Sequence, residues 1–271
     1  MTQKYIGIDV GGTKILLQVF DAKLKLTAEK KVKTDVSHGK AGFLKQLYGL
    51  IDEFFDSKTL GISVAVPGIV DYKRGVLVKA PHLPTGRDLK LKALLEKQYK
   101  VPVHIDHDIN AFLAEEYKTP ALAKYQNVLA VMVGTGLGGA AIVNGKLYYG
   151  ESGFAGEFGH MVIDEHSRLK TLEQNTSGHF IPQITRMVGE KNLKKHLIEN
   201  LGLGLANLNL IFNPEVMVLG GSVYLNLLRD RKIQLGKIIA RHSLDGKAPK
   251  LIDANPKASV ARGAVRLLAD R

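Results

Sequence analysis

Residues 5–20 read YIGIDVGGTKILLQVF, which is an apolar run, a pair of glycines and a second apolar run. Apolar, β-branched runs on either side of a glycine turn are typical of a β-hairpin. The same arrangement returns at residues 128–143, which read VLAVMVGTGLGGAAIV. One strand–turn–strand unit in each half of the chain indicates a duplicated architecture.

The segments around the two hairpins alternate between the strand period and the helix period. Such alternation predicts an α/β protein, here with a mixed sheet in each half. We expect further strands at 27–33, 60–66, 101–105, 216–219 and 251–253, and helices at 40–56, 89–98, 109–117, 178–212, 225–242 and 259–269.

The composition is that of an ordinary globular protein. Of the 271 residues, 45% are hydrophobic and 24% are charged. No apolar run approaches the roughly 20 residues of a membrane-spanning helix, and we see no signal-peptide pattern. The absence of cysteine excludes disulfides and thiolate metal sites, and it fits a reducing compartment. We therefore expect a cytoplasmic protein with no membrane partner.

The chain is basic, with a formal net charge of +12. Such a charge suits a nucleic acid, an anionic surface or an anionic small molecule as partner. The basic residues form no block, however, and the densest spots, Lys30–Lys33 and Lys194–Lys195, lie in amphipathic contexts. We interpret the charge as dispersed surface lysines that help to attract an anionic phosphoryl donor, and we expect no nucleic acid partner.

The first glycine turn has the residue types of a phosphate and metal site. Because Gly11 and Gly12 lack a Cβ, backbone N–H groups can approach phosphate oxygens there, and the Thr13 hydroxyl adds a donor. Asp9, at the end of the first strand, can hold a magnesium ion through water. The alternative is a hairpin turn that needs glycine only for its conformation.

The second turn, Gly134-Thr135-Gly136-Leu137-Gly138-Gly139, has more glycines than a turn requires. A strand follows it, so it is not the dinucleotide fingerprint, which opens a helix. It is not a Walker loop either, since no Gly-Lys-Ser/Thr follows. Two such turns suggest a pair of loops that hold a polyphosphate from opposite sides.

A carboxylate follows the strand predicted at 101–105. Asp108 would lie beyond the C-terminal end of that strand, at the mouth of an α/β sheet, where a general base is well placed. Phosphoryl transfer to an alcohol requires a carboxylate that orients and deprotonates the hydroxyl. Asp108 could also be the N-cap of the 109–117 helix, and the two roles are compatible. A metal site in the stretch His104–Asp108 is disfavoured, because side chains alternate along a strand.

A carboxylate and an imidazole lie among the glycines of residues 153–160. Glu157 and His160, with Glu173 downstream, are suitable hydrogen-bond partners for sugar hydroxyls. The alternative is a surface turn with a capping glutamate.

Together these motifs resemble the ROK family of bacterial repressors, open-reading-frame products and sugar kinases. The resemblance runs from Tyr5 to Ala264 and implies the two-lobed actin/hexokinase-like (ribonuclease H-like) fold, with a cleft between the lobes. We expect an N-terminal lobe of residues 1–110, completed by a helix at 257–271, and a C-terminal lobe of residues 111–256. The motifs, in family order, are Asp9-x-Gly-Gly-Thr-Lys14, Pro67-Gly68, Asp108-x-Asn110, Gly134-Thr-Gly-x-Gly-Gly139, Gly156-Glu-Phe-Gly-His160 and Gly220-Gly221.

The resemblance also implies residue roles. Asp108 would be the catalytic base that deprotonates the attacking sugar hydroxyl. The reaction implied is transfer of a phosphoryl group from ATP to a hexose hydroxyl, as in a glucokinase, with Mg²⁺ held through water at Asp9. The residues implied at the phosphates are Asp9, Gly11, Gly12, Thr13 and Lys14 from one lobe and Gly134, Thr135 and Gly136 from the other, with Gly220 and Gly221 beside the adenosine. The residues implied at the sugar are Gly68, His82, His107, Asp108, Glu157, His160 and Glu173.

The chain departs from the family pattern in two places. His107 and His82 stand where the family usually has Asn, at two expected sugar contacts, so the identity of the sugar stays open. Zinc-containing members carry a cysteine loop after the Gly-Glu-x-Gly-His segment. Here the stretch 161–172 is shorter and has no cysteine, while Glu173 keeps its place. We therefore expect no zinc, and we expect the apolar residues of that stretch to pack beneath the site.

Alternatives remain for the substrates and for the class of protein. The sugar can be fructose, mannose or an N-acetylhexosamine in place of glucose, and the donor can be polyphosphate in place of ATP. The family's repressor branch places a helix-turn-helix domain ahead of the sugar-binding body, and the early position of Asp9 argues against it here. A non-catalytic sugar-binding regulator is a further alternative, against which intact Asp9, Asp108 and both glycine turns argue. The family habit predicts a homodimer.

Overall fold

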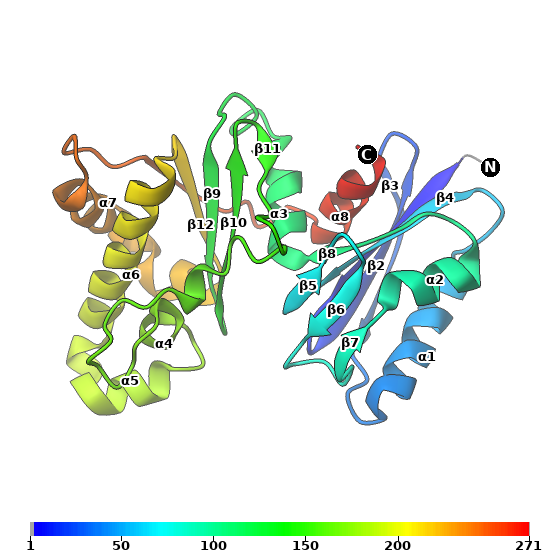
Figure 1. The fold of residues 1–271 in the computed structure, drawn as a ribbon, viewed down its shortest axis with the longest axis horizontal. Helices are drawn as coiled ribbons and strands as arrows, with labels where there is room; N and C mark the ends of the chain where they lie inside the picture. Colours follow the sequence, from blue (N-terminus) through cyan, green and yellow to red (C-terminus); the bar gives the residue numbers. More distant parts are fainter. Residues whose placement is uncertain (1–2, 271) are drawn as a thin grey trace. The chain divides into compact units, whose positions relative to one another are not determined.

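Each predicted hairpin begins a five-stranded sheet in the computed structural model, which describes residues 3–270. The two sheets have the same strand order. In each sheet the three strands that come first along the chain are antiparallel neighbours, with the second strand in the middle. Two further strands, parallel to the first strand, follow on its other side. The duplication inferred from the two glycine turns is therefore confirmed. The chain divides into two compact units, one around each sheet (Figure 1).

The first unit is built from three parts of the chain. It holds the chain up to Thr119, residues 150–154 and the chain from Lys257 onwards, and the second unit holds Pro120–Tyr149 and Ala155–Pro256. The sequence interpretation assigned residues 111–117 to the second lobe. By its contacts this helix lies in the first unit, because α3 (Asp108–Tyr117) packs against α8 (Val260–Ala269).

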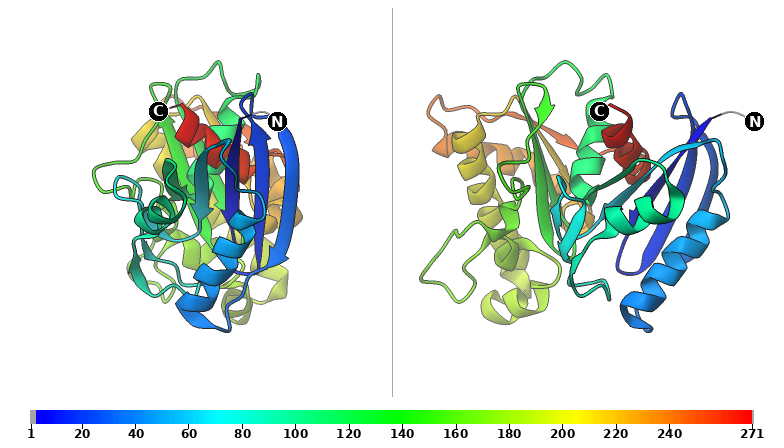
Figure 2. Two further views of the ribbon diagram at one scale, coloured as in Figure 1. Left: turned by 90° about the vertical axis from the view of Figure 1, so that its right-hand side faces the viewer. Right: turned by 45° about the vertical axis from the view of Figure 1, so that its right-hand side comes forward.

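The sheet of the first unit has a helical layer on each face. Ile6, Ile8 and the neighbouring apolar side chains form a core with α1 (Gly39–Asp52) and α2 (Leu91–Tyr99). On the other face α8 contacts β1, β4 and β8, and Figure 2 shows this helix (red) against the blue strands. The strands, in spatial order, are β3 (Leu26–Lys33), β2 (Lys14–Asp21), β1 (Lys4–Val10), β4 (Thr59–Val66) and β8 (Val103–His107).

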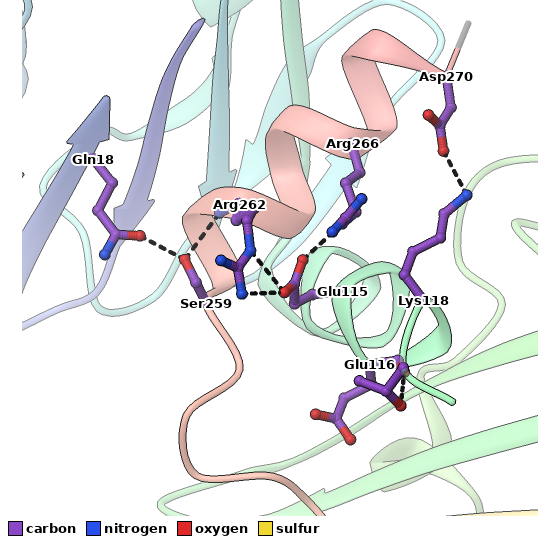
Figure 3. A network of polar contacts seen from close by, with 9 residues as sticks. Gln18, Glu115, Glu116, Lys118, Ser259, Arg262, Arg266 and Asp270 are labelled. Atoms are coloured by element: carbon purple, nitrogen blue, oxygen red, sulfur yellow. Dashed lines mark hydrogen bonds and ion pairs between the residues drawn. The ribbon is translucent and has the colours of Figure 1, made fainter. Parts of the chain in front are cut away.

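An ionic contact joins α3 to α8 within the first unit (Figure 3). Glu115 of α3 is 6% exposed and accepts hydrogen bonds from Arg262 Nε at 2.7 Å and Arg266 Nε at 2.8 Å, both on α8. The predicted helix start at Ser259 is confirmed, since its hydroxyl accepts from Arg262 N as an N-cap. Paired on both oxygens, the Glu115 carboxylate can be buried at little cost.

A small three-stranded sheet in the first unit was not predicted. Its strands are short and lie among turn residues, so no period-2 pattern marks them. They are β5 (Ile69–Asp71), β6 (Val76–Lys79) and β7 (Arg87–Leu89).

The second unit places its long helices on one face of its sheet. The predicted helix at 178–212 is interrupted, because Gly189 has a φ of 78° between α5 (Ile181–Val188) and α6 (Glu190–Phe212). Among the described residues, no helix is long and apolar enough to cross a membrane. The strands, in spatial order, are β11 (Lys146–Leu147), β10 (Leu137–Val143), β9 (Val128–Val133), β12 (Val216–Gly220) and β13 (Lys250–Asp253).

The predicted helix at 225–242 begins irregularly. A π-turn at Tyr224–Leu228 and a 3₁₀ turn at Arg229–Arg231 precede α7 (Lys232–His242). The Tyr224 hydroxyl and Arg229 Nε donate to the two carboxylate oxygens of Asp253 at 2.8 and 2.9 Å. Both side chains therefore tie this irregular segment to the end of β13 (Lys250–Asp253).

Candidate active site

The first glycine turn connects β1 to β2 and is fixed by the residue after β3. Gly11 N donates to the Lys14 carbonyl at 2.8 Å, which closes the turn. The Thr34 hydroxyl donates to the Gly11 carbonyl at 2.6 Å, and Thr34 N donates to the Thr13 carbonyl at 3.1 Å. Sequence reasoning missed Thr34, because a threonine after a strand carries no signal of its own.

The segment around His82 lies against this turn. A Cβ on Gly12 would come within 2.9 Å of His82 Cβ, so only glycine permits the contact. Gly68 has a φ of 97°, and a Cβ there would clash with the Lys79 carbonyl oxygen and lie 2.9 Å from Ala80 Cα. The structure therefore brings the expected sugar residue His82 next to the expected phosphate turn. Thr13, Lys14 and His82 are all exposed there.

Asp9 and Asp108 lie at the same edge of the first sheet. Asp9 is the second-last residue of β1, and Asp108 directly follows β8, with β1, β4 and β8 parallel. Burial, and after it the charge of Asp108, raises the pKa of Asp9 from 3.8 to about 6, against the opposing effect of Lys14. Burial also raises the pKa of Asp108, whose side chain is 33% exposed, while His107 opposes the shift. A carboxyl group with a raised pKa is a stronger base at neutral pH.

His107 links the end of β8 to the start of α3. Its Nδ1 accepts from Ile109 N at 3.3 Å and lies 3.1 Å from Asp108 Oδ1. One neutral ring nitrogen cannot accept from Ile109 N and donate to Asp108 at once, so the two contacts belong to different tautomers of the ring. His107 is the N-cap of α3 and Asp108 is its first residue, which corrects the alternative that Asp108 is the cap.

The second glycine turn is shorter than the sequence suggested. Only Gly134, Thr135 and Gly136 lie between β9 and β10, because Leu137 already pairs with Val133 in the sheet. The segment after α4 (Leu172–Thr176) binds the backbone of this turn. There Gly178 N donates to the Gly134 carbonyl at 2.8 Å and His179 N donates to the Thr135 carbonyl at 2.9 Å.

The side chain of Glu173, from α4, contacts this second turn. Its Oε2 accepts from Leu137 N at 2.7 Å, and a Cβ on Gly136 would come within 2.8 Å of the same oxygen. The segment with Glu157 and His160 runs beside it, since a Cβ on Gly159 would lie 3.2 Å from Glu173 Cβ. His160 Nε2 is 3.8 Å from Glu157 Oε2, and the His160 side chain is 75% exposed.

Hydrogen bonds hold the loop between His160 and Glu173. Leu172 N donates to the Met161 carbonyl at 2.9 Å, and Thr171 makes a capping box with Gln174. The buried Asn175 amide donates to the carbonyls of Leu169 at 2.7 Å and of Thr171 at 2.9 Å. Leu169 and Leu172 are buried as predicted, whereas Val162 is 53% exposed, because its strand-like pairing with Thr171 turns it outward.

The Gly220–Gly221 pair ends β12 beside the second turn. Gly221 has a φ of 86°, and its Cα lies against the backbone of Val133, the residue before Gly134. A cavity of about 660 Å³ opens along the segment that follows. None of the expected site residues lines it. Its lining is Lys194, Leu225, Asn226, Arg229, Asp230, Lys232 and Asp253.

Asp9, the predicted magnesium ligand, has the chemistry that Mg²⁺ requires. Within residues 3–270, no group of three or more His, Cys, Asp or Glu side chains is placed to hold a metal ion. Mg²⁺ does not require such a group, since it keeps several waters and binds through one or two carboxylates and the substrate phosphates. A cation at Asp9 would also relieve the repulsion between Asp9 and Asp108 that raises the pKa of Asp9.

Known proteins resemble the whole chain. A ROK hexokinase from Thermus thermophilus is 27% identical, with a TM-score of 0.81 over 99% of this chain and 100% of that chain. An N-acetyl-D-glucosamine kinase from Salmonella paratyphi A is 29% identical over 91% of this chain and 93% of that protein. A xylose repressor from Caldicellulosiruptor bescii is 25% identical over 92% of this chain and 74% of the repressor.

These likenesses define an α/β protein with the two-domain actin/hexokinase-like fold that the sequence predicted. The ROK family model matches residues 5–228. The chain belongs to the ROK family, whose members here include both sugar kinases and repressors.

Proposed function

We propose that the protein is a sugar kinase that transfers a phosphoryl group from Mg²⁺-ATP to a hydroxyl of a hexose. The observation that carries the proposal is the carboxylate pair of the first unit. Asp9 and Asp108 lie at the ends of β1 and β8, and both have a raised pKa. Phosphoryl transfer to an alcohol uses a carboxylate that orients the hydroxyl and accepts its proton. Carboxyl groups with a perturbed pKa cluster at functional sites.

In this proposal each group of the first unit has one task. Asp108 accepts the proton of the sugar hydroxyl, with His107 Nδ1 lying 3.1 Å from its Oδ1. The turn Gly11–Thr13 offers backbone N–H groups to phosphate oxygens. Asp9 would hold Mg²⁺ through water, and the ion, when bound, neutralises charge on the transferring phosphates.

The groups of the second unit are proposed for phosphate and sugar binding. Gly134–Gly136, with Gly220 and Gly221, would contact the donor. Glu157, His160 and Glu173 would accept hydrogen bonds from sugar hydroxyls. Glu173 already uses one oxygen on Leu137 N, which leaves its Oε1 for such a contact.

Glucose is our first choice of acceptor, and the kinase relative named for N-acetyl-D-glucosamine supports an N-acetylhexosamine as the alternative. The test is a turnover screen of glucose, mannose, fructose, N-acetylglucosamine and N-acetylmannosamine, each with Mg²⁺-ATP and with polyphosphate. We expect one sugar to be phosphorylated with ATP, and we expect the protein to be a homodimer by light scattering.

A sugar-binding regulator is the second candidate, because a xylose repressor aligns with 92% of this chain. The two candidates differ in one measurement. A regulator binds its sugar in calorimetry but gives no sugar phosphate with either donor. Binding without turnover across the whole screen would refute the kinase proposal.

A further inference from the structure

A buried histidine–aspartate pair lies on β8 directly before Asp108. His104 and Asp106 are each 1% exposed, and His104 Nε2 is 3.0 Å from Asp106 Oδ2. Residues two apart on a strand share a face, so both side chains point to one side of the sheet. That side is the one covered by α8, since Ser63, the register partner of His104 on β4, donates from its hydroxyl to the Ala264 carbonyl at 2.6 Å.

The other oxygen of Asp106 binds the start of α3. Oδ1 accepts from His107 N at 2.7 Å and from Asn110 Nδ2 at 2.9 Å. These donors flank Asp108 on both sides, so one carboxylate fixes the short segment that carries it. Hydrogen bonds in a buried network are strengthened by the low local dielectric, because water does not compete for them.

Burying these two polar side chains costs desolvation free energy, which their hydrogen bonds must offset. Here Ala65, Ala111 and Ala264 form an apolar cluster on the same face of the sheet, so an apolar pair would be compatible with the surroundings. The pair instead aims its hydrogen bonds at the two residues that flank Asp108.

We propose that Asp106, supported by His104, is a positioning residue that holds the Asp108 carboxylate in register for proton transfer. This inference rests on the proposed kinase function. Asp106 acts through Asn110 and the His107 amide and does not touch the reacting atoms. Its effect is therefore on kcat, because displacing a catalytic group by about 1 Å can cost roughly 100-fold in rate.

The chain offers a matched control on the same helix. Glu115 is also a buried carboxylate with two polar partners, but it lies two turns beyond Asp108 and binds Arg262 and Arg266 of α8 (Figure 3). Removing its charge loosens the contact between α3 and α8 without touching the first turn of α3. A purely structural role for Asp106 predicts that both carboxylates behave alike.

The experiment compares Asp106→Ala, Asp106→Asn and Glu115→Gln in the full chain, with the best sugar of the screen and Mg²⁺-ATP. For Asp106→Ala we expect kcat to fall roughly 10- to 100-fold, while the sugar KM changes less than about 3-fold. Asp106→Asn should recover most of the rate. Its carboxamide oxygen can still accept from Asn110, and its NH₂ can donate to the other tautomer of His104. Glu115→Gln should lower the melting temperature and leave kcat within about 3-fold of wild type.

Hydrogen exchange of the amides at residues 107–112 gives a readout independent of turnover. We expect exchange there to rise about tenfold in Asp106→Ala and to stay unchanged in Glu115→Gln. If Asp106→Ala does not fold, His104→Phe replaces it, because the phenyl ring keeps volume and removes the donor to Asp106. Unchanged exchange, or equal kcat losses in the Asp106 and Glu115 variants, overturns the inference. Absence of turnover in the wild type overturns the kinase proposal instead, and the exchange result still decides on Asp106.

Discussion

Replacing Asp9 by asparagine should stabilise the protein at neutral pH. The pKa of Asp9 is raised from 3.8 to about 6, chiefly by burial and then by the charge of Asp108. A shift of about two pKa units corresponds to roughly 3 kcal/mol, which partial exposure of the side chain reduces to about 1–2 kcal/mol. The folded protein binds more protons than the unfolded chain between about pH 4 and 6, so the free energy of unfolding falls as pH rises through that window and levels off above it.

Urea denaturation of wild type and Asp9→Asn from pH 4 to 8 measures this difference. We expect equal stabilities near pH 4, divergence between about pH 4 and 6, and a constant gap of about 1–2 kcal/mol in favour of the variant above that range. Asp35→Asn is the control of opposite sign, because hydrogen bonds from His38 and Ser37 lower the pKa of Asp35 to about 2. It should not gain stability at neutral pH. A variant of Asp9 no more stable than wild type at pH 7.5 would refute the reasoning.

Three further predictions concern turnover, sugar choice and metal content. Asp108→Ala should lower kcat by roughly 10²- to 10⁴-fold with the fold and sugar affinity intact, and a variant that retains more than about a tenth of wild-type kcat removes Asp108 from the mechanism. His82→Asn and His107→Asn should shift the ranking of hexoses more than the KM for ATP, because an imidazole is bulkier than a carboxamide and presents different donors and acceptors. Unaltered ranking in both variants contradicts this. Elemental analysis should find no stoichiometric zinc, and chelation followed by restored Mg²⁺ should leave the melting temperature unchanged. One zinc per chain, lost together with activity, would show that the loop before Glu173 needs a metal.

The elements with a clear period could be predicted from the sequence. The first hairpin and the helix at 109–117 are confirmed within two residues, because apolar alternation and helical spacing reflect burial directly. The second hairpin is confirmed as an element, but its returning strand already begins at Leu137, inside the stretch expected to be turn. The strands β5–β7 could not be predicted, since three- and four-residue strands among turns leave no period to read. The break at Gly189 was missed because an isolated glycine is tolerated inside a helix.

The candidate site was predictable as residue types but not as contacts. The glycines beside Asp9 and the position of Asp108 after a strand can be recognised in the sequence. The residues that hold these groups in place cannot. Thr34, which fixes the first turn, and Asp106, which fixes the start of α3, act through bonds that only the folded chain reveals. The spacing from Asp106 to Asn110 is a usable signal once the strand is known to end at His107.

The direction of the pKa shift distinguishes the carboxyl groups proposed for the active site from those that join elements of the fold. Asp56 and Asp253 join elements together, and hydrogen bonds from their partners lower their pKa. The donor to Asp56 is Lys4. Burial raises the pKa of Asp253, but bonds from Lys232, Tyr224 and Arg229 outweigh it. Such groups stabilise the fold in the charged form. Asp9 and Asp108 have the opposite shift, so their charged forms lower the stability of the fold. A folded chain retains such a loss where the charge is needed for binding or catalysis. A ligand that brings positive charge to Asp9 should therefore stabilise the protein more at pH 7.5 than at pH 5, which is the behaviour expected of Mg²⁺-ATP and not of an uncharged sugar.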